Sequence, residues 1–177
     1  MNTLHTRTPL AALAATAALL LALTGCAGTA TAEPSATTAP EADSITVEDA
    51  WVKTAEEGMS AAFGTIENTG DTDVVIVGAS TAASPMIELH ETVEDDSGAM
   101  VMRQKEGGFV IPAGDHLHLE PGGNHIMLMG LADPIVAGDE VTFTLEFEDG
   151  STLEFTAPGK DYEGANETYE GDMDMDR

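Results

Sequence analysis

His125 and Met127 stand two residues apart in the segment His125-Ile126-Met127, a spacing that places both side chains on one face of a β-strand. Imidazole nitrogen and thioether sulfur are donors that suit copper(I), and they are durable in an oxidising compartment where thiolates tend to form disulfides. The chain has nine methionines and a single cysteine. This pattern predicts a copper(I) site built without cysteine.

Short segments of alternating apolar and polar residues predict half-buried strands and an all-β fold. Turn residues such as Asp149-Gly150 separate them, at a spacing typical of sandwiches and barrels. No segment in this region has the pattern of a long amphipathic helix. The expected strands cover residues 45–52, 61–67, 74–79, 86–90, 116–120, 125–129, 141–147 and 153–155.

The alternation also predicts which side chains face the core. In the strand expected at 125–129, Ile126 and Leu128 should point inward. The candidate donors and one carboxylate share the opposite faces of their strands, namely Met86, Glu88, His90, His125, Met127 and Met129. The histidines and thioethers should therefore lie together, turned away from the core.

The sequence resembles the PCu(A)C family of periplasmic copper chaperones, whose motif is a His, a Met further along the chain, and then a distant His-x-Met. The resemblance covers residues 45–158. The matching stretches are Glu88-Leu89-His90-Glu91-Thr92, Met100-Val101-Met102, Ile111-Pro112-Ala113-Gly114 and the run from Leu119-Glu120-Pro121-Gly122-Gly123 through His125-Ile126-Met127 to Leu131.

This resemblance implies four ligands for one copper(I) ion per domain: His90, Met102, His125 and Met127. The stretch between His90 and Met102 is one residue longer than the family pattern, so Met100 stays open as a substitute for Met102. Met129 shares the face of Met127 and also stays open. The resemblance further implies a cupredoxin-like or immunoglobulin-like Greek-key sandwich, copper bound near the surface, and delivery to the copper centre of cytochrome c oxidase or to another copper chaperone.

The N-terminal region has the order of a secretory signal, with an apolar run that leads to Leu23-Thr24-Gly25-Cys26. The run is shorter than the roughly 20 residues that cross a bilayer as a helix. Residues 1–26 are therefore expected to be a lipoprotein signal peptide that ends in a lipobox. Lipidation of Cys26, the only cysteine, would anchor the protein on the outer face of the cytoplasmic membrane, in the periplasm or at the cell surface.

The rest of the chain divides by composition. Residues 27–43 predict a flexible tether, residues 44–160 one copper-binding sandwich, and residues 161–177 an acidic disordered tail. Met173 and Met175 in this tail could gather copper weakly. His116 and His118 could bind copper(II) or zinc at a second site, although a solvated strand face is the favoured interpretation.

The net charge of −26 makes nucleic acid an implausible partner. No nucleophile with a partner base is recognisable, so no enzyme activity is expected. Blue-copper electron transfer requires a Cys beside two His, and Cys26 is committed to the lipobox. The leading function is therefore an extracytoplasmic copper(I) chaperone. Two alternatives stay open: a copper-scavenging surface lipoprotein for copper tolerance, and a metal-free adhesion or scaffold module.

Overall fold

The computed structural model describes residues 39–164 and 168–169. These residues belong to one compact unit, Thr38–Arg177. The only helical element in the described part is a short 3₁₀-helix, η1 (Glu41–Ser44). None of the helices in these residues has the length and apolar character needed to cross a membrane. All other regular structure is β, which confirms the predicted class.

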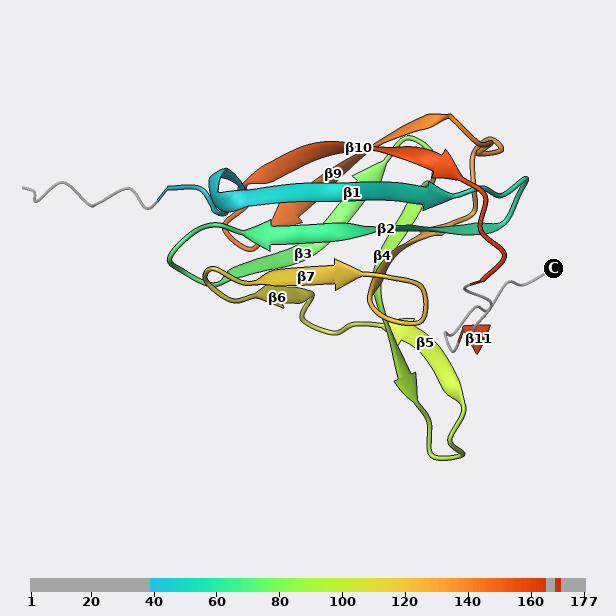
Figure 1. Cartoon of the computed structure of the whole chain (residues 1–177), viewed down its shortest axis with the longest axis horizontal. Coiled ribbons are helices and arrows are strands. Elements are labelled where there is room, and N and C mark those ends of the chain that lie inside the picture. The colour runs from blue at the N-terminus through green and yellow to red at the C-terminus, as the bar shows by residue number, and fades with distance from the viewer. Residues whose placement is uncertain (1–38, 165–167, 170–177) are drawn as a thin grey trace, which may run out of the picture. The chain divides into compact units, whose positions relative to one another are not determined.

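The strands are short and joined mainly by tight turns (Figure 1). They are β1 (Ile45–Lys53), β2 (Met59–Asn68), β3 (Val74–Thr81), β4 (Met86–Glu94), β5 (Met100–Gln104), β6 (Phe109–Ile111), β7 (His116–Leu119), β8 (His125–Met129), β9 (Glu140–Phe147), β10 (Thr152–Lys160) and β11 (Thr168–Tyr169).

Two layers of strands form the sandwich. One layer has the order β11-β5-β4-β8-β2-β1, with β7 also paired to β2, and the other has the order β10-β9-β3-β6. The layers are continuous at one edge, where β1 and β10 pair in parallel through Val52↔Gly159 and Lys53↔Lys160. In Figure 1, β1, β2 and β7 lie in front of β3, β6 and β9. The outcome is the predicted β-sandwich.

The main core fills the space between the two layers. Its largest fully buried side chains are aromatic or branched aliphatic, and they include Phe109, Phe143, Phe147, Ile66, Ile126 and Leu128. Burying each such side chain contributes about 1.5–3 kcal/mol, so this cluster supplies most of the hydrophobic free energy of folding. Ile126 and Leu128 lie in this core, as the alternation along β8 predicted.

A smaller second cluster lies on the other side of β8. It consists of Ala61, Phe63, Met102, Met127 and Met129, with Trp51 packed against it. Trp51 reaches this cluster because the pairing of β1 with β2 shifts between Glu48 and Trp51, which reverses the faces of the residues that follow. Gly64 permits the irregularity, since a Cβ there would lie 3.1 Å from Ala50 Cα at a φ of +152°.

The strand predictions were right in position and wrong mainly in extent. All eight expected segments overlap strands, but β4 runs on to Glu94 and β10 to Lys160. Two strands were not predicted from the sequence. These are β5, which carries Met102, and β6. Both are short and lack the alternation of apolar and polar residues: β5 has three apolar residues followed by Arg103 and Gln104, and all three residues of β6 are apolar.

The ends of the unit are more ordered than composition suggested. Ala42, placed in the expected tether, is buried, and its amide donates to Ser151 Oγ at 3.1 Å. In the expected tail, Thr168–Tyr169 pairs in parallel with β5, and Tyr162 packs against Trp51 with ring centroids 5.4 Å apart. The signal segment, Cys26, Met173 and Met175 lie outside the described residues.

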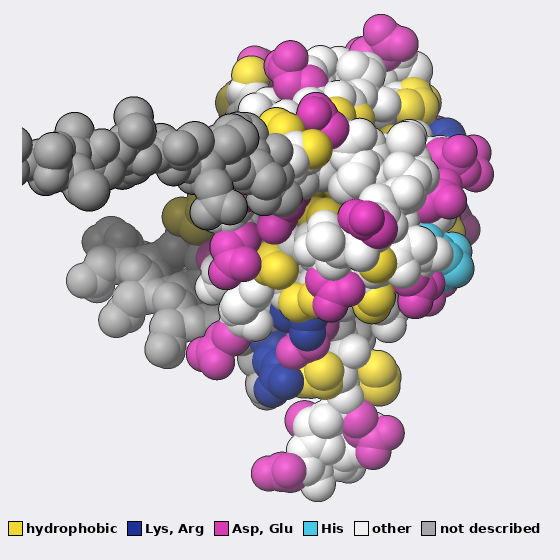
Figure 2. Space-filling model, turned by 90° about the vertical axis from the view of Figure 1, so that its left-hand side faces the viewer, with side chains coloured by type: hydrophobic (Ala, Val, Ile, Leu, Met, Phe, Trp, Pro, Cys, Tyr) yellow, Lys and Arg dark blue, Asp and Glu magenta, His cyan; other side chains and the backbone are white. Residues whose placement is uncertain are grey.

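Acidic side chains dominate the surface. Figure 2 shows them spread over the visible face, whereas lysine and arginine gather mainly in one small group below the centre, with a further small patch near the upper right edge. An acidic surface attracts cations and repels anionic polymers. The distribution agrees with the net charge of −26.

Candidate metal centre

Two histidines meet where β4 and β8 lie side by side. His90 pairs directly with His125, and their ring centroids lie 5.4 Å apart with the ring planes at 68°. One step along the same face, Met127 lies opposite Glu88. The antiparallel register therefore brings His90 next to His125 and Met127, which are far from it in sequence.

The β4–β5 hairpin brings the fourth predicted donor to the same face. Met102 lies opposite Thr92, one same-face step from His90, and packs in the second cluster with Met127. On the reverse face of β4, Glu91 accepts hydrogen bonds from Arg103 and Lys105 of β5 and its continuation. The bond from Lys105, opposed by partial burial and reinforced by Arg103, holds the pKa of Glu91 below its ordinary range. These contacts fasten the hairpin that carries Met102.

The predicted ligands are buried, which the sequence did not anticipate. His90 is 0% exposed, His125 4%, Met102 7% and Met127 5%. They do lie on the face turned away from the main core, as the alternation predicted. That face is covered by aromatic side chains: Phe63 lies 6.2 Å from the His125 ring, and Trp51 lies 4.5 Å from Phe63 between centroids.

A pocket of about 350 Å³ gives access to this buried group. Met102, His125 and Met127 all line it, and Pro121 and Gly122 of the turn before β8 form part of its wall. Three of the four predicted ligands thus border one cavity, while His90 does not line it and lies next to His125. An ion in the pocket could reach the donors without opening the main core.

Hydrogen bonds orient both histidine rings. His90 Nε2 lies 2.7 Å from Glu88 Oε2, which assigns the proton to Nε2 and the lone pair to Nδ1 in the neutral ring. His125 Nδ1 lies 3.0 Å from the carbonyl oxygen of Gly123, which assigns its lone pair to Nε2. Such contacts are the usual way in which proteins fix histidine ligands and raise their basicity. Glu88 also supplies a negative charge beside the donors.

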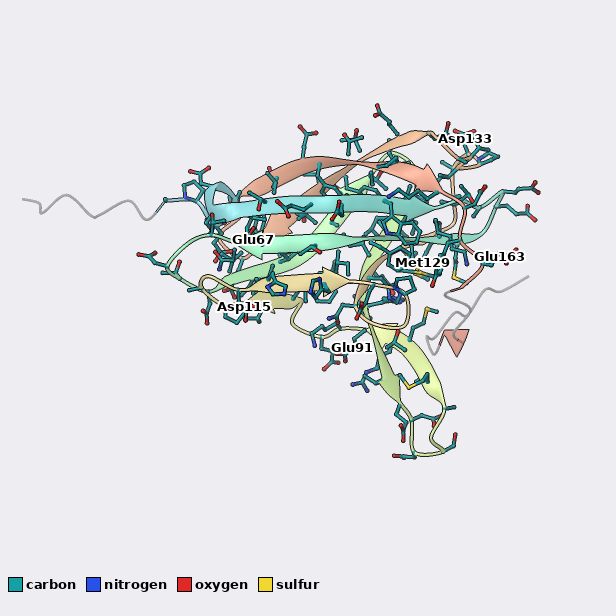
Figure 3. The ribbon with its side chains drawn as sticks, in the orientation of Figure 1. Glu67, Glu91, Asp115, Met129, Asp133 and Glu163 are labelled. Carbon is teal, nitrogen blue, oxygen red and sulfur yellow. The ribbon has the colours of Figure 1, made fainter. Side chains whose placement is uncertain are left out.

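Exposure distinguishes the two hairpin methionines. Met100 is 49% exposed and pairs with Glu94 toward the turn, whereas Met102 is buried against Met127. The geometry therefore favours Met102. Met129 is buried in the same cluster, one same-face step beyond Met127 and further from the histidine pair. Figure 3 shows sulfur atoms gathered around Met129 and along β5.

His116 and His118 form a separate pair on β7. Their ring centroids lie 4.6 Å apart; His118 Nδ1 lies 3.2 Å from Thr65 Oγ1, and His116 Nδ1 lies 3.4 Å from Asp115 Oδ1. Strand β7 pairs with β2 at 64–67, whereas β8 pairs with β2 at 59–62. Both rings are on the exposed face, and they do not join the group around His125.

The thioethers matter because the described part of the chain has no cluster of the commoner metal-ligand side chains. No three His, Cys, Asp or Glu side chains are arranged there to hold a metal ion. Beside His90 and His125, the thioethers of Met102 and Met127 are the side-chain donors that complete a set of four. Two imidazoles and two thioethers form a soft, neutral set, which suits copper(I).

Sequence reasoning missed two residues of this region. Glu88 was placed on the correct face, and its spacing from His90 was the available signal for a supporting role. Met59 was not among the candidate donors from the sequence, yet it pairs with Met129 and lines the pocket. No local signal could have located Met59, because its position depends on the register between β2 and β8.

Comparison with known proteins gives consistent matches. A family model described as "Putative lipoprotein LpqE-like" matches residues 45–159. A protein of Leifsonia xyli subsp. xyli, "Putative lipoprotein Lxx21020", is 50% identical over 155 residues, which is 88% of this chain and 92% of that protein.

Solved structures share the fold. The copper(I) form of DR1885 from Deinococcus radiodurans is 30% identical, with a TM-score of 0.52 over 74% of this chain and 93% of that one. The copper-bound PCuAC domain of PmoF2 is 19% identical, with a TM-score of 0.56 over 67% of this chain and 94% of that one. The second likeness supports the fold alone.

Proposed function

The chain belongs to the LpqE-like lipoprotein family, and on that premise we propose that it is an extracytoplasmic metallochaperone that binds one copper(I) ion and passes it to an acceptor protein. Its fold is that of PCuAC copper-chaperone domains, as the resemblance of the motifs implied. The observation that carries the proposal is the meeting of two histidines and two methionines from three strands beside one pocket.

In this proposal His90 binds through Nδ1 and His125 through Nε2, the atoms that keep their lone pairs. Met102 and Met127 complete the set with sulfur. The carboxylate of Glu88 offsets the single positive charge of the ion, since a buried cation without a partner would be costly. A neutral donor set with one nearby carboxylate holds copper(I) without fixing it as tightly as thiolates would.

Transfer would proceed through the pocket. The donors share one face of the sheet formed by β5, β4 and β8, so an acceptor with its own soft ligands could enter the pocket and replace Met102 or His125 first. The ion would change partners in steps and never be released to water. No bond of a substrate is made or broken, so the function is transport and not catalysis.

The lipoprotein family supports a location outside the cytoplasm. We propose export across the cytoplasmic membrane, lipidation at Cys26, and anchoring on the outer face, in the periplasm or at the cell surface. The proposed acceptor is the copper centre of cytochrome c oxidase or another copper chaperone, which the resemblance of the motifs supports. The copper-scavenging alternative uses the same site without an acceptor.

Copper(I) titration of the Thr38–Arg177 unit, under anaerobic reducing conditions against a chromogenic copper(I) chelator, tests the site. The parent should retain one equivalent, and a His125→Ala/Met127→Ala variant should lose it. The matched control is His116→Ala/His118→Ala, which removes two exposed histidines of β7 and should keep the equivalent. Failure of the parent to compete would overturn the proposal and favour the metal-free module.

Mixing the copper-loaded unit with the soluble copper domain of a cytochrome c oxidase subunit tests delivery. Copper should appear on the acceptor faster than it dissociates to a chelator of equal affinity. Equal rates would mean passive release, which would exclude directed delivery to this acceptor and support the scavenging function.

A further inference from the structure

Three methionines lie in one row across three neighbouring strands. Met129 of β8 pairs with Met59 of β2 on one side and with Met86 of β4 on the other. Directly opposed residues on antiparallel strands have Cβ atoms about 4.5–5.5 Å apart and project from the same face. We call Met59, Met129 and Met86 the methionine row.

The two outer members of the row are exposed. Met59 is 44% exposed and Met86 52%, whereas the central Met129 is 5% exposed. Methionine usually fills gaps in a core, and an isolated exposed apolar side chain needs no explanation. A row in register is different, because two accessible thioethers flank a third on adjacent strands.

The row adjoins the proposed copper site. Met59 lines the same pocket as His125 and Met127, and Met129 packs in the second cluster with Met102 and Met127. Along β8, Met127 and Met129 are two residues apart, about 7 Å in a strand. Thioethers therefore continue from the buried donors to side chains that solvent can reach.

We propose that the methionine row is a second, weaker copper(I) position at the mouth of the site, through which the ion enters and leaves. This inference rests on the proposed function, since copper is the cargo. Three neutral thioethers select a soft ion over the hard cations that an acidic surface also attracts. The row lacks imidazole, so it should hold copper less firmly than the four buried ligands.

Exchange between the two positions needs only side-chain movement. Met129 is next to Met127 on the same face and has the flexible, unbranched chain that allows its sulfur to shift between neighbours. An ion held by Met59, Met129 and Met86 could exchange one thioether for Met127 and then bind the imidazoles. Oxidation state and charge do not change in this transfer.

Titration with copper(I), observed through the ¹³C-labelled methionine methyl groups of the Thr38–Arg177 unit, tests the row directly. The first equivalent should shift the methyl signals of Met102 and Met127. Further copper should shift those of Met59, Met86 and Met129. In a Met59→Leu/Met86→Leu variant the second step should disappear, the first should remain, and copper removal by an external chelator should slow by roughly tenfold.

A matched control keeps the number of exposed thioethers but moves them. Val110→Met/Val136→Met, added to the double leucine variant, places two methionines at positions that are each 55% exposed and outside the row. It should not restore the second step or the removal rate. Restoration would show that any surface thioether suffices and would overturn the inference.

The outcomes separate this inference from the proposed function. If copper shifts the methyl signals of Met102 and Met127 but never those of Met59 and Met86, the proposed second copper position is overturned. The proposed four-ligand site then still stands. Shifts confined to Met59, Met86 and Met129 support the row and contradict the four-ligand site. The absence of any copper-dependent shift contradicts both.

Discussion

Strand β8 separates two interiors that are equally buried and chemically different. On one face, Ile126 and Leu128 pack into the main core, which contains no methionine or histidine among the described residues. On the other face, His125, Met127 and Met129 are 4–5% exposed and meet other soft donors. Burial alone therefore does not tell which face stabilises the fold and which binds an ion.

The difference lies in what the side chains can do once buried. Branched aliphatic and aromatic groups have few rotamers and specify one packing, whereas methionine is flexible and adapts to irregular space. A cluster rich in methionine contributes less to a unique fold but can rearrange around an incoming ion. Substitutions on the two faces should thus have opposite effects on stability and on copper binding.

The largest expected effect is on the main-core face. Leu128→Ala removes a fully buried side chain and should lower the free energy of unfolding by about 2–5 kcal/mol. Urea unfolding, followed by the fluorescence of Trp51, the only tryptophan, measures this loss. Copper(I) affinity of the folded protein should stay within a few-fold of the parent. A large loss of copper affinity with little loss of stability would contradict the assignment of fold stability to this face of β8 and of copper binding to the opposite face.

Met127→Leu tests the other face with a side chain of similar volume. Its cost in stability should be under about 1.5 kcal/mol, because the hydrophobic contacts persist. Copper(I) affinity should fall by about 100-fold, equivalent to about 2.7 kcal/mol, because leucine offers no donor. Chelator competition measures the affinity and urea unfolding the stability. The control Ile126→Val alters the neighbouring buried residue and should leave copper affinity unchanged.

Glu88→Gln should have a smaller effect, since Glu88 acts through His90. The variant keeps a hydrogen-bond acceptor near His90 Nε2 but removes the charge. Copper(I) affinity should fall by roughly 10-fold to 100-fold, the usual range for a residue that orients a metal-binding histidine. Glu91→Gln is the matched control, because that carboxylate pairs with Arg103 and Lys105 on the reverse face. Equal losses in both variants would indicate a general effect of surface charge.

The same comparison explains how far the sequence could predict the structure. Alternation along a strand is a local property, so the positions of the strands and the separation of Ile126 from Met127 were predictable. The burial of the donor face was not, because Phe63 and Trp51 that cover it come from other strands. The face on which the Trp51 side chain lies depends on a register shift in β1, and no clear sequence pattern predicts this shift.

The family resemblance and the structure contribute different information about the site. The motif named four ligands and left Met100 as an alternative, which exposure argues against. Pairing across strands then added Met59 and set how Glu88 and Met86, already expected on the donor face, lie relative to the ligands, through the registers of β4 and β2 with β8. Contacts of this kind depend on long-range pairing, which a local pattern does not specify.

The smallest expected effect on stability is at Asp149, whose hydrogen bonds stabilise the turn between β9 and β10. Its carboxylate accepts hydrogen bonds from the hydroxyl and the amide of Ser151 in the same turn, and from the amide of Glu41, which is distant in sequence. These bonds, with that from the Ser151 hydroxyl foremost, hold the pKa of Asp149 below its ordinary range. The carboxylate is solvent-exposed, so its contribution to stability should be small.

Because the folded-state pKa is lowered, Asp149 stabilises the fold above its unfolded pKa of about 3.9, and this stability is lost as the pH falls through the lower folded pKa. Asp149→Asn should therefore be slightly less stable than the parent at pH 7, and the difference should vanish in acid. Thermal unfolding of both proteins between pH 7 and pH 2 measures it. Copper(I) affinity at pH 7 should be the same in both. A change in affinity would mean that the two interiors are coupled through the sandwich and are not separable as the packing on β8 indicates.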